Sequence, residues 1–66
     1  MSIKNFGSNL KRERMKKGYS QRELAEIVGI TNPAICKYER NQRVPMVDVA
    51  FKLAEALGTT VDELLK

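Results

Sequence analysis

Residues 20–40 constrain the fold of this chain more than any other stretch, because they contain the start and stop signals of a short helix and the start of another. Ser20 followed by Glu23 is a capping box, in which two free amides at a helix start are satisfied reciprocally. Gly29 can take a positive φ, so the helix is expected to end near Val28. The stretch therefore predicts two short helices joined by a tight turn.

The second helix of this pair begins at Thr31 or Asn32, since either side chain can cap it and a proline follows in the first turn. Its inner face carries Ile35 and Tyr38. Its outer face is polar and basic, and consists of Pro33, Cys36, Lys37 and Arg40. Leu24, Ile27 and Val28 are expected on the inner face of the first helix. An apolar inner side with a basic outer helix is the arrangement of a helix-turn-helix.

The chain before the capping box predicts a longer helix over residues 4–17. Phe6 and Leu10 stand four residues apart and therefore share one face. Arg14 continues this apolar stripe with a charge, and Glu39 lies at the edge of the inner stripe of its own helix. Because a lone charge on an inward face is costly, we expect Arg14 and Glu39 to pair with each other.

The chain after residue 41 predicts two more helices, one at about 46–57 and a short one that begins at the capping box of Thr60 with Glu63. Side chains expected in the core are Val47, Ala50, Ala54, Leu57, Val61 and Leu64. Four further apolar residues exceed what one small core can hold and predict a dimer interface: Val49, Phe51, Leu53 and Leu65. The sequence thus predicts an all-α fold, a compact five-helix domain spanning residues 1–66.

Composition removes several functional classes. The chain has no His and a single Cys, which excludes an internal disulfide and a zinc ligand set, so we expect no metal and no cofactor. No apolar run is long enough for a membrane span or a secretory signal, which favours the cytoplasm. Because no activated nucleophile, converging carboxylates or glycine-rich phosphate loop is evident, we expect neither an enzyme nor a small-molecule ligand.

The charge is distributed unevenly along the chain. Residues 1–43 hold ten Lys or Arg and four Glu, a net charge of +6, whereas residues 44–66 hold two Lys and four carboxylates, a net charge of −2. A basic surface on one part of a small domain predicts a polyanionic partner. RNA is disfavoured, because only two Phe and two Tyr are available for base stacking and most of them are expected to be buried.

A combination of positions along nearly the whole chain, roughly 6–65, carries a family resemblance. These positions are Phe6-Gly7, Leu10, Arg14, Gln21, Ala25, Gly29, Ile35, Tyr38, Glu39, Pro45 and the run A-E-A-L-G-T-T-V-D-E-L-L. Together they resemble the DNA-binding domain of the Cro and lambdoid phage repressor family. The resemblance implies a five-helix domain, a helix-turn-helix at about residues 20–40 and operator binding as a dimer. The chain departs from the family at Met46, usually a capping residue, and at Asn41, often Gly.

Two sets of DNA contacts are expected, and the resemblance implies the first set and the role of Gln21 in the second. The base-reading positions are Asn32, Pro33, Ala34 and Lys37, with Thr31 at the entrance. Lys37 can donate to guanine or to a phosphate. Asn32 can pair with adenine, cap the helix or be held by Gln21. Pro33 and Ala34 can touch thymine methyls or simply start and pack the helix. Phosphate contacts are expected from Gln21, Arg22, Arg40, Asn41 and Arg43. The alternative for each charged residue of this set is that it only keeps the surface soluble. The Arg14–Glu39 pair is implied as well.

These features predict a sequence-specific regulator of transcription that binds double-stranded DNA, as a repressor and as a homodimer on a two-fold-related operator. A phage-type repressor, a restriction–modification controller and an antitoxin all remain open. The alternative is a protein-interaction module, such as an antitoxin whose main partner is a toxin or a polymerase subunit. The basic outer helix favours DNA, while the surplus apolar residues fit both hypotheses.

Overall fold

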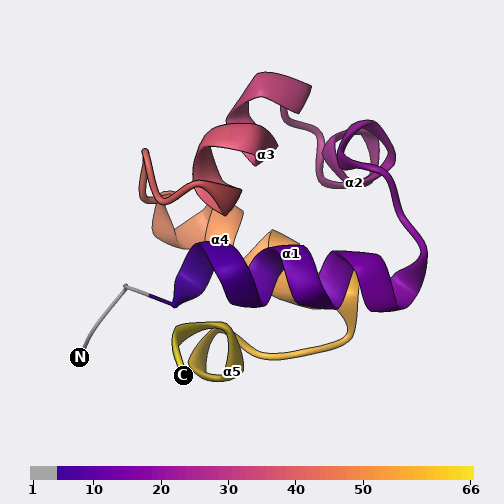
Figure 1. The fold of residues 1–66 in the computed structure, drawn as a ribbon. Coiled ribbons are helices and arrows are strands. Elements are labelled where there is room, and N and C mark those ends of the chain that lie inside the picture. The colour runs from indigo at the N-terminus through magenta and orange to yellow at the C-terminus, as the bar shows by residue number, and fades with distance from the viewer. Residues whose placement is uncertain (1–4) are drawn as a thin grey trace.

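The computed structural model describes residues 5–66, which form five helices and no strand (Figure 1). In chain order the helices are α1 (Phe6–Lys17), α2 (Gln21–Val28), α3 (Asn32–Glu39), α4 (Val47–Leu57) and α5 (Val61–Leu65). The long helix α1 crosses the domain and contacts α3, α4 and α5, while α2 packs against α3 and α4. The predicted five-helix fold is therefore confirmed, although residue 4, predicted in the first helix, lies outside the described residues. Within residues 5–66, no helix combines the length and the apolar character that a membrane span requires.

The predicted start and stop signals of the helix pair operate in the structure. The Ser20 hydroxyl accepts a hydrogen bond from the Glu23 N–H at 3.0 Å, and the Glu23 carboxylate accepts one from the Ser20 N–H at 2.8 Å. Gly29 ends α2 with a φ of 84°. Thr31 is the residue that caps α3, because its hydroxyl accepts a hydrogen bond from the Ala34 N–H at 3.3 Å. The turn between α2 and α3 is therefore defined by local interactions.

The starts of α4 and α5 differ from each other. Met46 occupies the N-cap position of α4 without a side-chain hydrogen bond, as expected where a capping residue is missing. The capping box predicted for α5 is only half formed: the Thr60 hydroxyl accepts a hydrogen bond from the Glu63 N–H at 3.1 Å, whereas the Glu63 carboxylate accepts one from Lys66 Nζ at 3.3 Å. Asn41 follows α3 with a φ of 57°, so it adopts the left-handed conformation that asparagine tolerates better than most residues. Side-chain caps thus start α2, α3 and α5 but not α4.

The core is built from leucine and isoleucine side chains of all five helices. Its largest fully buried members are Leu10, Leu24, Ile35, Leu53, Leu57 and Leu64. The predicted burial of Ile27 is wrong, since this side chain is 53% exposed. The buried face of α2 is centred on Leu24, Ala25 and Val28, and Ile27 lies about 100° away around the helix axis.

Two predictions for α4 are also wrong. Val47, expected in the core, is 73% exposed. It is the first residue of α4, and side chains of an α-helix tilt toward the N-terminal end, away from the buried middle of the helix. Leu53, expected at a dimer interface, is fully buried, because it shares the inner face with Ala50, Ala54 and Leu57. The apolar surface of α4 therefore includes Val47 and excludes Leu53, which is the reverse of the prediction.

Candidate nucleic-acid interface

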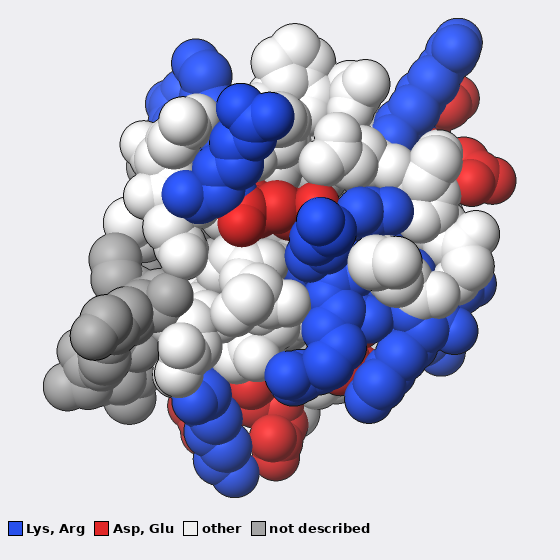
Figure 2. All heavy atoms as spheres, viewed as in Figure 1, with Lys and Arg blue, Asp and Glu red and all other residues white. Residues whose placement is uncertain are grey.

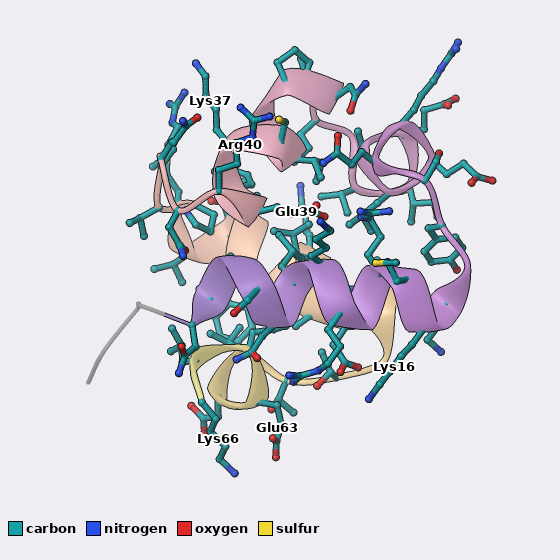
Figure 3. The ribbon with its side chains drawn as sticks, viewed as in Figure 1. Lys16, Lys37, Glu39, Arg40, Glu63 and Lys66 are labelled. Atoms are coloured by element: carbon teal, nitrogen blue, oxygen red, sulfur yellow. The ribbon has the colours of Figure 1, made fainter. Side chains whose placement is uncertain are left out.

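The outer face of α3 presents most of the predicted base-reading residues to solvent. Ala34 is half-buried and packs against the core. The exposed members of this set are Thr31, Asn32, Pro33 and Lys37. Figure 3 shows Lys37 and Arg40 projecting outward from α3, whereas Glu39 points toward α1. At eight residues, α3 is about 12 Å long, so its exposed face can enter a major groove.

The predicted phosphate-binding residues lie on α2 and on the segment after α3. Gln21 is half-buried as the first residue of α2. Arg22 is exposed and lies 3.6 Å from Glu26, and a pair with exposed fractions of 82% and 72% holds the guanidinium only weakly. Arg40 and Arg43 are exposed. Four side chains of this set, Gln21, Arg22, Arg40 and Arg43, therefore lie on α2 or directly after α3. The fifth residue, Asn41, has a second role in the fold.

The Asn41 side chain caps α1 from a distance. Its Oδ1 accepts a hydrogen bond from the Gly7 N–H at 3.0 Å, and Gly7 is the second residue of α1. Asn5, the N-cap residue of α1, makes no side-chain cap of its own. Asn41 thus supplies the acceptor that a helix start needs, 34 residues along the chain. This role of Asn41 was not predicted, and a glycine inside a predicted helix is the signal that points to it.

Arg14 and Glu39 form the predicted ion pair. Arg14 Nε lies 2.6 Å from Glu39 Oε2, and Arg14 Nη2 lies 3.2 Å from Glu39 Oε1, so the contact is bidentate. The two side chains are 11% and 4% exposed. Arg14 Nη1 also donates to the Tyr19 carbonyl at 2.7 Å, and Gln21 Nε2 donates to Glu39 Oε1 at 3.0 Å. The pair therefore joins α1, the segment before α2, the start of α2 and the end of α3.

The surface charge follows the prediction for one face of the domain. Figure 2 shows Lys and Arg side chains over α1, α2 and α3, with a patch of carboxylate between α3 and α1. Figure 3 places Glu39 in that position, where Arg14 balances its charge. The exposed charges on the outer face of α3 are therefore basic, which suits a polyanionic partner.

An apolar groove of about 430 Å³ lies between the loop after α3, α4 and α5, and we call it the α4–α5 groove. It is lined by Phe6, Asn41, Arg43, Val44, Pro45, Val47, Ala50, Phe51, Val61 and Leu65. Two of the predicted interface residues, Phe51 and Leu65, line this groove. Val49 packs against the core, and the prediction for Leu53 is wrong because this side chain is fully buried. Val44 and Met46, 58% and 76% exposed, extend the apolar surface and were missed because they precede the helical stripe of α4.

Among residues 5–66, the titratable groups outside these contacts form no second site. In the part of the chain that the structure describes, no three His, Cys, Asp or Glu side chains lie close enough to hold a metal ion. Cys36 is a half-buried free thiol. Two hydrogen bonds with Ser20 hold the pKa of Glu23 below its usual 4.5, and the bond from the Ser20 backbone N–H has a larger effect than the one with the Ser20 side chain. This shift belongs to the helix cap and not to a reactive centre.

The geometry is that of a repressor-like helix-turn-helix, and comparison with known proteins agrees: the chain belongs to the helix-turn-helix family whose model matches residues 10–64. It is 43% identical over 61 residues to YonR, an HTH-type transcriptional regulator derived from the SPbeta prophage of Bacillus subtilis (strain 168). That match covers 92% of this chain and 56% of YonR. The chain spans about half the length of the first curated relatives it matches.

Two solved structures show the same fold. The P22 c2 repressor in complex with a synthetic operator superposes with a TM-score of 0.89 at 33% identity, covering 92% of each chain. The restriction–modification controller protein C.AhdI from Aeromonas hydrophila gives a TM-score of 0.87 at 35% identity, covering 94% of each chain. The all-α, repressor-like architecture predicted from the sequence is thus confirmed by both structures.

Proposed function

We propose that this chain regulates transcription by binding double-stranded DNA at a specific sequence, with α3 in the major groove. The observation that carries the proposal is an exposed, basic outer face on α3 whose orientation is held by the buried Arg14–Glu39 pair. A reading helix must be rigid as well as complementary, because small misplacements break base contacts. The regulator YonR and the operator-bound P22 c2 repressor are similar to this chain and support the proposal.

Within this proposal, the two kinds of contact fall to different residues. Lys37 donates to guanine O6 and N7 or to a phosphate, and Asn32 pairs with adenine. Thr31, Pro33 and Ala34 set how closely the helix approaches the base edges. Phosphate contacts, which provide register and affinity, come from Gln21, Arg22, Arg40, Asn41 and Arg43.

We also propose that the chain represses transcription in the cytoplasm as a homodimer on a two-fold-related operator. One short helix reads only a few base pairs, whereas two copies about 34 Å apart read two half-sites. The α4–α5 groove and the exposed side chains of Val44, Met46, Val47 and Phe51 provide an apolar surface for a second copy. This surface replaces the predicted one at Leu53, which belongs to the core.

Selection from random duplex DNA tests sequence-specific binding. We expect a palindromic or nearly palindromic site to be enriched. Lys37→Ala should weaken binding to that site by about 1–3 kcal/mol and relax the preference at one base pair of each half-site. The matched control is Lys52→Ala, an exposed lysine on α4, which should leave the preference intact. A flat selection would refute the proposal and favour the protein-interaction alternative.

Light scattering tests the dimer separately. We expect the wild-type chain to approach twice its monomer mass as concentration rises and Phe51→Ser to remain a monomer. Ile27→Ser is the control, because Ile27 is a similarly exposed apolar residue on α2 that does not line the α4–α5 groove. Equal masses for wild type and Phe51→Ser at every concentration would contradict this interface.

A further inference from the structure

The Glu39 carboxylate is a shared hydrogen-bond acceptor for two different helices. Its side chain is 4% exposed and accepts bonds from Arg14 Nε at 2.6 Å, Arg14 Nη2 at 3.2 Å and Gln21 Nε2 at 3.0 Å. Arg14 is itself held by the Tyr19 carbonyl at 2.7 Å. The carboxylate therefore cannot rotate away without breaking several bonds at once, so Gln21 donates to a fixed partner.

This contact decides which way the Gln21 carboxamide faces. A carboxamide has one end that donates two N–H bonds and one end that only accepts, while an ionised carboxylate only accepts. Glu39 can therefore pair only with the nitrogen end of Gln21. One N–H of that nitrogen goes to Glu39, and the second is left to point elsewhere. A DNA phosphate is also only an acceptor, so it requires the nitrogen end as well.

We propose that Glu39 is a positioning residue for DNA binding, which orients the Gln21 carboxamide so that its second N–H donates to a backbone phosphate. This inference rests on the proposed function, since it takes Gln21 as a phosphate contact. Without the carboxylate, the carboxamide of Gln21 is free to turn its oxygen toward the phosphate, and the two acceptors then repel each other. The buried ion pair thereby sets a DNA contact in addition to holding the helices together.

The free protein gives the first test. In a proton-exchange NMR measurement, we expect the Gln21 side-chain amide protons to exchange more slowly than those of Gln42, an exposed glutamine in the loop after α3. Glu39→Gln should bring the exchange of Gln21 close to that of Gln42. Equally fast exchange of Gln21 in the wild type and in Glu39→Gln would overturn the inference without any reference to DNA.

A double-mutant cycle on the selected operator gives the second test. Gln21→Met and Glu39→Gln should each weaken binding about tenfold or more, and the double variant should be no weaker than either single variant, because both remove one contact. If Glu39→Gln is unfolded in thermal melts, Arg14→Met/Glu39→Met replaces it, since this pair removes both buried charges with apolar side chains.

Operators carrying a neutral methylphosphonate at one position distinguish positioning from a merely structural role. At the phosphate that Gln21 contacts, the substitution should weaken the wild type about tenfold and leave Glu39→Gln unaffected. If Glu39→Gln remains as sensitive to every methylphosphonate as the wild type, the residue acts only on the fold and the inference fails. If the wild type selects no DNA sequence at all, the proposed function fails instead, while the NMR result still decides the orientation of Gln21.

Discussion

Replacing Gly7 with alanine is expected to separate α1 from the end of α3. A Cβ at this position would lie 2.5 Å from the Glu39 carbonyl oxygen, 2.7 Å from the Tyr38 carbonyl oxygen and 2.8 Å from Asn41 Oδ1. Two of these three atoms belong to the backbone, so a side-chain rotation cannot relieve the contact. Because a carbon normally stays about 3.3 Å or more from a carbonyl oxygen, the end of α3 must move by about 0.6–0.8 Å.

Opposing effects determine the sign of this change. Alanine has a higher helix propensity than glycine, which stabilises by at most about 1 kcal/mol. Overpacking of this kind costs about 1–3 kcal/mol, and loss of the Gly7–Asn41 hydrogen bond costs about 1 kcal/mol more. The expected net loss is about 1–3 kcal/mol, from a total of about 3–10 kcal/mol for a domain of 66 residues.

Thermal and urea unfolding followed by circular dichroism measure this loss. We expect Gly7→Ala to lower the unfolding midpoint by at least about 5 °C, since 1 kcal/mol corresponds to about 4–8 °C for a domain of this size. The control is Ser8→Ala in the same turn, where the side chain is exposed and the change should stay within about 0.5 kcal/mol. A Gly7→Ala variant as stable as the wild type would refute the close contact between α1 and α3.

Three other perturbations test the fold. Arg14→Met leaves the buried Glu39 carboxylate without its cation, so urea unfolding should show a loss of stability of about 3–5 kcal/mol. Arg14→Met/Glu39→Met should largely restore the stability, and an Arg14→Met variant as stable as the wild type would contradict the ion pair. Because the folded-state pKa of Glu23 is lowered, the ionised carboxylate stabilises the fold fully above pH 4.5, and this stabilisation is lost as the pH falls through the folded pKa. The difference in stability between the wild type and Glu23→Gln should therefore shrink in acid, and a difference that does not change with pH would contradict this cap. Leu53→Ala should lower the free energy of unfolding by about 2–5 kcal/mol without changing the mass measured by light scattering. A lower mass with unchanged stability would instead show that Leu53 belongs to the dimer interface.

The helices follow from the sequence because their boundaries are set by neighbouring residues. The capping pair Ser20 and Glu23 and the turn at Gly29 act over a few positions, so a linear reading identifies them. Burial is a different matter. Val47 and Leu53 have similar apolar side chains on one helix, yet the first is 73% exposed and the second is fully buried. Which of them is covered depends on where the other helices end, and spacing along one helix does not contain that information.

The candidate site shows the same division. The Arg14–Glu39 pair is predictable, because two charges on inward faces of a small domain need each other. The contact of Asn41 with Gly7 is not, since it depends on how the end of α3 lies against the first turn of α1. The donation from Gln21 to Glu39 was not predicted either, because the expected partners of Gln21 were a phosphate and Asn32. Side-chain roles that require two helices to meet thus come from the structure.

The proposed function depends above all on the outer face of α3 reading a specific DNA sequence. The most direct test measures the dissociation constants for the selected duplex and for a scrambled duplex of the same length and composition, at several salt concentrations. We expect the selected duplex to bind at least about 10³-fold more tightly at physiological salt, with affinity for both falling steeply as salt rises. Equal affinity for the two duplexes at every salt concentration would contradict the claim.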